Sequence, residues 1–228
     1  MQLAAVILAR ALAFIEVFDL NPRGKVFFPE LVKGIVDRYK FQKFPTKFED
    51  FDISKGVLFE EGKISGKVIQ KFTIFDTLLV VETQSGTTDS KEIIEEMLTW
   101  AAAKFGINYA AGVIKRNAYV SGVSFYSDVP ILAANSLLEA LAAKTSTALS
   151  EIWQEPVHYE TVGIAVGHDT GARKFPIAQF TLTRREAAKF SENKYYSEAP
   201  LPTDVHLVLL EEYEAGMRKS MEAKGGKA

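Results

Sequence analysis

The 228-residue chain has no cysteine, only three histidines and two tryptophans, and a formal net charge of only −2 at pH 7. Without cysteine, the protein has no disulfide, no thiol nucleophile and no thiolate metal site. A nearly neutral chain does not attract nucleic acid through its overall charge, so only a local basic patch could do so. The absence of disulfides also fits a reducing compartment.

Long hydrophobic runs are scarce as well. Within the apolar first twenty residues, the longest stretch without a charge is Met1–Ala9, which is far too short to span a bilayer. An Ala-x-Ala pattern occurs at residues 9–13, but no basic residue precedes the apolar run as in a secretory leader. A buried N-terminal element explains this composition better. We therefore expect a soluble cytoplasmic protein that does not associate with membranes.

The overall composition is that of a globular domain, with 47% hydrophobic and 25% charged residues. Alternating bulky side chains predict a strand at Leu12–Phe18, and residues 2–9 either extend it or form a short helix. A helix is predicted to start at Pro29, because apolar residues after it recur on one helical face. These residues are Leu31, Val32, Ile35, Val36 and Tyr39.

The rest of the first half predicts three strands and a second helix. The strands are Val57–Phe59, Val68–Phe75 and Leu78–Thr83, with a turn at Glu61-Gly62 after the first of them. Asp89 is placed to cap the helix that follows, and Glu92 completes a capping-box spacing. Gly106 is expected to end this helix.

The second half of the chain repeats this pattern. The predicted elements are a strand at Ala118–Tyr126, a helix at Ile131–Ser150, strands at Thr161–Val166 and Ile177–Thr183, and a last helix from Thr203 to about Lys219. Each half thus contains a strand, a helix, two or three strands and a helix, although no residue-level repeat accompanies this order.

We therefore predict an α+β fold, with a mainly antiparallel sheet, helices packed on one face, and a pseudo-duplicated strand-helix-strands-helix unit. The halves are expected at residues 1–110 and 111–221, followed by a flexible tail at 222–228. In its order of elements the chain resembles the saddle-shaped sheet of TATA-binding proteins. No motif of that family is present, so no function is inferred from the resemblance.

The most unusual local composition lies at Arg38–Phe48, which we call the basic-aromatic segment. It holds four cations and four aromatic residues and no acid; the cations are Arg38, Lys40, Lys43 and Lys47, and the aromatic residues are Tyr39, Phe41, Phe44 and Phe48. Rings beside cations can stack on a partner and attract its negative charge, as in nucleic-acid or nucleotide binding. Alternatively, the rings face inward and the cations are ordinary solvated groups, since nine of the sixteen phenylalanines lie between Phe27 and Phe75.

The residues that follow favour a protein partner over nucleic acid. Glu49, Asp50 and Asp52 reverse the sign of the local charge at once, and an acidic block repels phosphate. Adjacent blocks of opposite charge can pair within the fold or between subunits.

A second candidate surface is Phe190–Pro202, which we predict to be a long loop. It carries two adjacent tyrosines, Tyr195 and Tyr196, and is stiffened by two prolines. Long ordered loops are often functional, and tyrosine suits interfaces because it offers apolar area with a polar tip. A connector that packs over the edge of the sheet explains the same sequence.

Catalytic signals are weak. His158, His168 and His206 match no metal-ligand spacing, and no nucleophile elbow is present. The best enzyme candidate places His168 with Asp169 and Arg173 in a hairpin loop, where an imidazole could act as a general base. The loop Thr83–Lys91 joins a strand to a helix N-terminus, but it lacks the phosphate-loop spacing.

The sequence thus predicts a non-enzymatic protein that works through protein contacts, as a partner-binding or self-associating assembly subunit. The residues expected at the contact are Arg38, Tyr39, Lys40, Phe41, Lys43, Phe44, Lys47, Tyr195 and Tyr196. Nucleic-acid or nucleotide binding through the basic-aromatic segment is the alternative, and an enzyme with a site near His168 is the second alternative. No cofactor or metal motif is found in the sequence.

Overall fold

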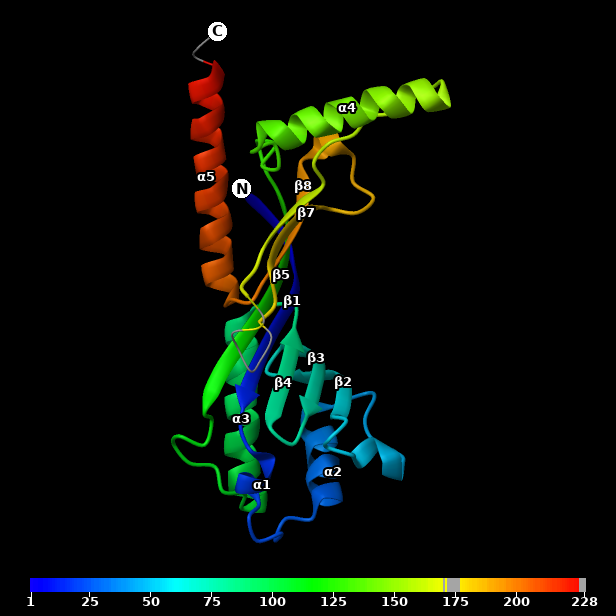
Figure 1. Cartoon of the computed structure of the whole chain (residues 1–228). Coiled ribbons are helices and arrows are strands. Elements are labelled where there is room, and N and C mark those ends of the chain that lie inside the picture. The colour runs from blue at the N-terminus through cyan, green and yellow to red at the C-terminus, as the bar shows by residue number, and fades with distance from the viewer. Residues whose placement is uncertain (170, 172–176, 226–228) are drawn as a thin grey trace. The chain divides into compact units, whose positions relative to one another are not determined.

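The structure is a computed structural model that describes residues 1–169, 171 and 177–225. Within these residues the chain forms an eight-stranded antiparallel sheet together with five α-helices, which confirms the predicted α+β class (Figure 1). No helix in the described part has both the length and the apolar character needed to cross a membrane.

Apart from its short helical turns, each half of the chain contains a strand, a helix, three strands and a helix in that order. The first half comprises β1 (Gln2–Phe14), α1 (Val17–Leu20), α2 (Phe28–Tyr39), η1 (Phe48–Phe51), β2 (Val57–Ile64), β3 (Lys67–Ile74), β4 (Leu78–Thr83) and α3 (Thr87–Phe105). The second half comprises β5 (Arg116–Tyr126), α4 (Ser136–Trp153), β6 (Gly163–Val166), β7 (Phe180–Arg184), η3 (Phe190–Glu192), β8 (Lys194–Ala199) and α5 (Thr203–Gly225).

The order of strands across the sheet shows the predicted pseudo-duplication. The strands lie in the order β2-β3-β4-β1-β5-β8-β7-β6. The counterparts are β1 and β5, β2 and β6, β3 and β7, and β4 and β8. When each strand is replaced by its counterpart, the list becomes the same order read backwards. In this correspondence α2 is the counterpart of α4, and α3 is the counterpart of α5.

The chain separates into two compact units. The N-terminal unit consists of Val6–Gly122 and Pro200–Asp204, and the C-terminal unit consists of the described residues of Met1–Ala5, Val123–Ala199 and Val205–Ala228. Strands β1 and β5 contribute residues to both units. The division of the chain near residue 110 stays a prediction.

The core of the N-terminal unit lies between the sheet and the helices α2 and α3. Ile35 of α2 and Met97 of α3 are buried in the same apolar cluster as Phe59 of β2 and Val81 of β4. Apolar residues three and four positions apart put one face of each helix onto the sheet, as the sequence pattern predicts. Gly106 ends α3 in the left-handed region (φ 72°), where its N–H bonds to the Ala102 carbonyl, so this helix end is confirmed.

Three local predictions in the first half are wrong. The strand predicted at Leu12–Phe18 ends at Phe14, and Val17–Leu20 forms a helical turn; residues 2–9 extend the strand, which was one of the two alternatives. The β2–β3 turn lies at Ser65-Gly66, with φ of 47° and 80°, and not at Glu61-Gly62. Gly62 lies inside the hairpin, opposite Ile69, because the ring of Phe41 covers it closely.

The third wrong prediction is the cap of α3. This helix begins at Thr87 after Gly86, so Asp89 lies inside its first turn. There the carboxylate pairs with Lys67 of β3, whose Nζ lies 2.6 Å from Asp89 Oδ1. The contacts with Lys67 and with the Ser85 hydroxyl lower the pKa of Asp89.

The second half differs from the prediction at three places. Helix α4 starts at Ser136, because the side chain of Asn135 accepts hydrogen bonds from the N–H groups of Leu137 and Leu138. Phe190–Pro202 is not a loop, since it contains η3 and the sheet strand β8. Helix α5 extends to Gly225, so residues 222–225 of the expected tail are helical, and residues 226–228 lie outside the described residues.

Two threonines join the starts of α3 and α5, and both belong to the N-terminal unit. Thr87 N–H donates to Thr203 Oγ1 at 3.1 Å, and Thr203 N–H donates to Thr87 Oγ1 at 2.8 Å. Both side chains are buried. Each hydroxyl therefore satisfies an amide at the start of the other helix, which would otherwise lack an intrahelical acceptor.

Replacing either threonine with valine keeps the side-chain shape and removes this acceptor. We expect Thr87→Val and Thr203→Val each to lower the free energy of unfolding by about 1–2 kcal/mol, measured by urea denaturation. Thr99→Val is the control, because Thr99 is exposed and its hydroxyl bonds only to the Glu95 carbonyl of its own helix. Equal losses in all three variants would contradict the reciprocal cap.

Candidate interaction surface

The structure places part of the basic-aromatic segment in the core of the N-terminal unit. Tyr39 and Phe41 are buried. The Phe41 ring centroid lies 5.3 Å from that of Phe59 and 6.4 Å from that of Phe72. These two predicted contact residues therefore offer no ring to a partner, because their rings are already packed against the sheet.

Arg38 joins α2 to α3 instead of projecting freely. Its guanidinium pairs with Glu96, and the Tyr39 hydroxyl donates to the same carboxylate. Arg38 also lies over the Trp100 ring, 5.2 Å from its centroid. Burial, followed by the bond to Glu96, raises the pKa of Tyr39 well above its usual range, so this phenol stays protonated at any physiological pH.

The remaining cations of the segment lie at the surface, and two of them face carboxylates. Lys43 Nζ lies 2.7 Å from Glu61 Oε1, and Lys47 Nζ lies 3.9 Å from Glu49 Oε1. Lys40 is exposed, as are the rings of Phe44 and of Phe48, which is 98% exposed. The segment thus keeps two exposed rings beside partly neutralised cations, and its role in partner binding stays a prediction.

The two tyrosines of the second predicted surface lie on β8. Tyr195 is buried against Phe125, and its hydroxyl donates to Asn193 Oδ1 at 3.1 Å. Tyr196 is partly exposed on the opposite side of the strand, and its hydroxyl donates to Glu198 Oε2 at 3.0 Å. Burial and the Glu198 carboxylate raise the pKa of Tyr196 to about 12. Strand alternation therefore leaves only Tyr196 of this pair for a partner.

The histidine of the enzyme alternative is held by the backbone of its own loop. His168 Nδ1 lies 2.9 Å from the Asp169 carbonyl, and its Nε2 accepts the Ile177 N–H at 3.3 Å. A carbonyl can only accept, so Nδ1 carries the proton and Nε2 has no lone pair left for a substrate. Arg173, the third residue of this hypothesis, lies outside the described residues.

A second histidine is paired with a serine, but in the wrong sense for catalysis. His206 Nε2 lies 2.9 Å from Ser197 Oγ, and both residues are fully buried. The Ser197 hydroxyl donates its one proton to the Thr181 carbonyl at 2.7 Å, so His206 Nε2–H is the donor in the pair. A histidine that donates to a serine cannot accept that serine's proton, and the pair therefore joins α5 to β8.

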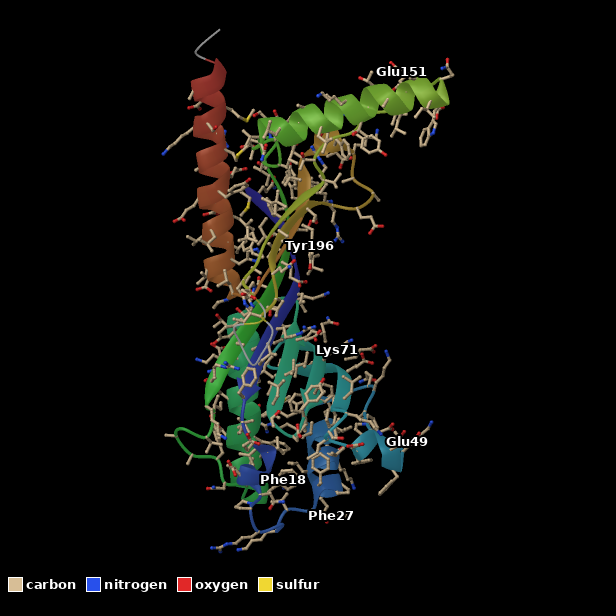
Figure 2. All side chains as sticks on the ribbon, in the orientation of Figure 1. Phe18, Phe27, Glu49, Lys71, Glu151 and Tyr196 are labelled. Carbon is tan, nitrogen blue, oxygen red and sulfur yellow. The ribbon has the colours of Figure 1, made fainter. Side chains whose placement is uncertain are left out.

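Helix α4 of the C-terminal unit is the most exposed apolar element of the described part. Not one of its residues is buried. Leu137 is 79% exposed, Leu141 61%, Ile152 71% and Trp153 58%. Figure 2 shows its side chains, Glu151 among them, standing out around the helix. Contiguous exposed apolar residues of this kind mark interaction sites.

The counterpart of α4 in the first half is packed against the sheet, as is usual for a helix with an apolar face. Helix α2 follows the first strand of its half as α4 does, and it buries Val32, Ile35 and Tyr39 against the sheet. Helix α4 buries none, although only Glu139, Lys144 and Glu151 are charged among its 18 residues. A helix with so few charges normally belongs to a core.

Two serines hold α4 to the chain that follows it. Ser146 Oγ accepts the Tyr159 N–H and Ser150 Oγ accepts the Val157 N–H, both at 2.9 Å. A groove of about 550 Å³ remains between this side of the helix and the rest of the unit. It is lined on the helix by Ala142, Ala143 and Ser146, and opposite by His158, Tyr159 and Arg184 among others.

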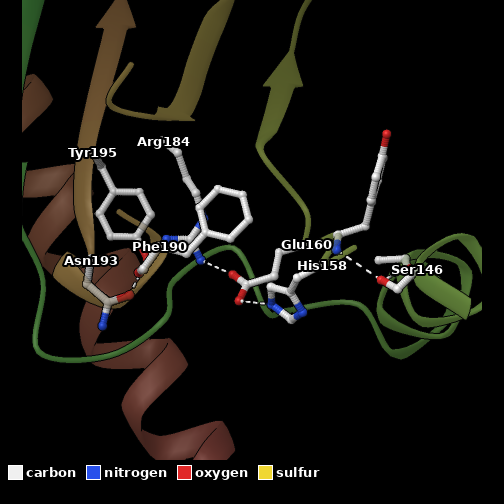
Figure 3. Close-up of polar contacts among 9 residues, drawn as sticks. Ser146, His158, Glu160, Arg184, Phe190, Asn193 and Tyr195 are labelled. Atoms are coloured by element: carbon white, nitrogen blue, oxygen red, sulfur yellow. Dashed lines mark hydrogen bonds and ion pairs between the residues drawn. The ribbon is translucent and has the colours of Figure 1, made fainter. Parts of the chain in front are cut away.

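Charged residues fix the return segment to the sheet (Figure 3). Glu160 pairs with Arg184 of β7 through one oxygen, and His158 Nε2 lies 2.9 Å from its other oxygen. The Arg184 side chain is only 9% exposed; its Nη1 donates to the Phe190 carbonyl at 2.9 Å and its guanidinium lies over the Phe190 ring. These contacts position the segment after α4 without covering the outer face of the helix.

Within the described residues, Arg184 Nε is buried without an acceptor. No cluster of three or more His, Asp or Glu in the same part of the chain is placed to hold a metal ion.

Sequence reasoning missed α4 as a surface. The sequence of α4 does contain a signal, because its composition is that of a core helix. Whether such a helix is exposed depends on whether its connections bring it onto the sheet, and the composition does not report this.

The core position of Phe41 can be tested at Gly62. A Cβ at Gly62 would lie 2.5 Å from the Phe41 ring, so Gly62→Ala is expected to lower the free energy of unfolding by about 1–3 kcal/mol. Gly216→Ala in α5 is the control: a Cβ there meets nothing within 4 Å, and it should stabilise the helix by up to about 1 kcal/mol. Urea denaturation measures both. If Gly62→Ala were neutral, Phe41 would be mobile and available to a partner.

The sequence matches no protein-family model and no curated protein at a significant level. No role is therefore transferred to this chain from another protein.

Proposed function

We propose that the protein is a non-enzymatic assembly subunit that self-associates through helix α4. The observation that carries this proposal is the exposure of Leu137, Leu141 and Ile152 on a helix without a buried residue. Water contact with this much apolar surface is unfavourable, and a second apolar surface would remove it.

The spacing of the apolar residues supports a second copy of the chain as the partner. Leu137, Leu141, Ala148 and Ile152 lie on one stripe of α4, separated by four, seven and four residues. This spacing is the same in both directions along the helix. In an antiparallel pair, Leu137 therefore faces Ile152 of the second copy, and Leu141 faces its Ala148. Self-complementary two-fold contacts are the commonest way in which identical chains pair.

The size and charge of the helix agree with such a pairing. Its 18 residues extend over about 27 Å at 1.5 Å per residue, which is long enough for several turns to interlock. Of the three charged residues, Glu139 lies on the opposite side of the helix from the stripe, whereas Lys144 and Glu151 lie along one border of it. Depletion of charge is typical of the buried centre of an interface.

Leu141→Glu tests the proposal directly. The wild-type protein is expected to form dimers whose fraction rises with concentration in light scattering coupled to gel filtration. The variant brings two carboxylates into the apolar contact of each dimer, so its dissociation constant should rise about 100-fold or more.

Thr147→Glu is the matched control, because it adds the same charge to the same helix on a different, exposed face. It should leave the dimer unchanged, and circular dichroism should show intact helices in both variants. A wild-type protein that stays monomeric at high concentration would contradict the proposal, as would equal dissociation of the two variants.

The basic-aromatic segment is retained as the second candidate surface, because Phe44 and Phe48 are exposed beside Lys43 and Lys47. Its pairing with Glu61 and Glu49 argues for a protein partner over nucleic acid, whose phosphates those carboxylates would repel. In the same light-scattering experiment, Phe48→Ser separates the two surfaces. A loss of dimer in this variant, with none in Leu141→Glu, would move self-association to the basic-aromatic segment.

A further inference from the structure

The N-terminal unit contains a cavity of about 370 Å³ between the sheet and its helices. Phe72 and Leu79 of the sheet form its floor, and Ile35 of α2 and Met97 of α3 form its sides. Helix α1 lies at one end of the cavity, and Figure 2 shows where its Phe18 lies. Because Phe18 lines the cavity and is largely exposed, we take this end as the mouth. The cavity therefore lies in the layer that elsewhere in this unit is filled by the packed aromatic rings.

The lining of this cavity is almost entirely apolar. Asn21 is its one polar side chain, and both ends of its amide are already used within the chain. Asn21 Nδ2 donates to the Val26 carbonyl at 2.9 Å, and Asn21 Oδ1 accepts the Val26 N–H at 3.2 Å. No ionisable residue contributes to the wall. A charged group inside would therefore find neither a counter-ion nor a hydrogen-bond partner.

The volume is that of a ligand site and exceeds that of a packing defect. Interiors are packed to the density of organic crystals, and gaps larger than a water molecule are few. An apolar cavity of roughly 150 Å³ stays dry and takes up benzene, and ligand sites begin at roughly 300 Å³. Empty apolar space of this size costs stability in proportion to its volume, and an apolar occupant recovers that loss.

The wall has both fixed and adaptable parts. On the sheet side, Phe72 and Leu79 are buried and belong to the hydrophobic cluster of the unit. Met97 is flexible and polarisable, so it can adjust to occupants of different shape. At the mouth, α1 is a single turn that is tied to the chain after α3 by the Asn108 N–H, which donates to the Leu20 carbonyl at 2.7 Å. The other end of α1 is held by the Val17 N–H, which donates to the Asp76 carbonyl at 2.8 Å. Entry beside Phe18 therefore involves a local movement of this short element.

We propose that this cavity binds a small, uncharged apolar molecule, of the size of two or three aromatic rings or a medium-length alkyl chain. Binding is driven by the removal of apolar surface from water, with shape as the main source of selectivity. The proposal is independent of self-association, because every lining residue belongs to the N-terminal unit and α4 belongs to the other.

N-phenyl-1-naphthylamine, a neutral fluorophore, is the probe for this site. Its emission should rise and shift to the blue on titration with the full-length protein, and should saturate at one molecule per chain. Ala101→Phe places a ring in the cavity and should weaken binding at least 10-fold; Leu31→Trp, at the α2 wall, is a second filling variant if the first fails to fold. Leu58→Trp is the control, because Leu58 is exposed on β2 and does not line the cavity.

Three outcomes would overturn the proposal. Unchanged binding in a folded filling variant would show that the probe lies elsewhere. Loss of the signal in Leu141→Glu would place the probe on α4. Displacement of the probe by decanoate as strongly as by decanol would contradict a site for uncharged molecules, since the lining offers nothing to a carboxylate. Displacement by decanol alone supports it.

Discussion

The burial of apolar helix faces is the constraint on which the rest of this structure depends. In the first half, α2 and α3 satisfy it by covering the sheet, and the rings of Tyr39 and Phe41 close the core that they form. In the second half the counterpart of α2 is α4, which has the composition of a core helix and buries nothing. The two halves thus share one topology, but the apolar helix face is buried within the chain in the first half and exposed in the second. The proposed self-association follows from that difference, because a second copy would supply the surface that the chain itself does not.

The core of the N-terminal unit is itself divided. Around Phe41, Phe59 and Phe72 the rings are in mutual contact, and Gly62 lacks a side chain so that Phe41 can lie directly on β2. Toward α1 the space between the same layers is open and lined by aliphatic and aromatic side chains. One end of this core is closely packed, and the proposed ligand would occupy the open end. Such a division of roles within one core is common in binding proteins, since a site must be held in shape by neighbours that do not bind.

Much of the fold could be predicted from the sequence, because the periods of apolar residues determine helices and strands locally. The order of elements, the duplication and the helix end at Gly106 are of this kind. The burial of Tyr39 was also predictable, since it follows Ile35 by four residues on one helical face, and its place among candidate contact residues ignored that spacing. The position of Gly62 inside a hairpin was not predictable, because it depends on the approach of Phe41 from outside the hairpin. The exposure of α4 was not predictable either, since composition reports what a helix would bury and not whether the chain brings it to a surface.

Hydrogen–deuterium exchange, followed by mass spectrometry at two protein concentrations, tests the central claim most directly. Backbone amides of Phe28–Tyr39 should be protected at both concentrations, because α2 is buried within the chain. Amides of Ser136–Trp153 should exchange rapidly in dilute protein and become protected only at the higher concentration, where the helix is covered by a second copy. Protection of α4 that is strong and independent of concentration would contradict this account, because it would mean that the chain already buries this helix by itself.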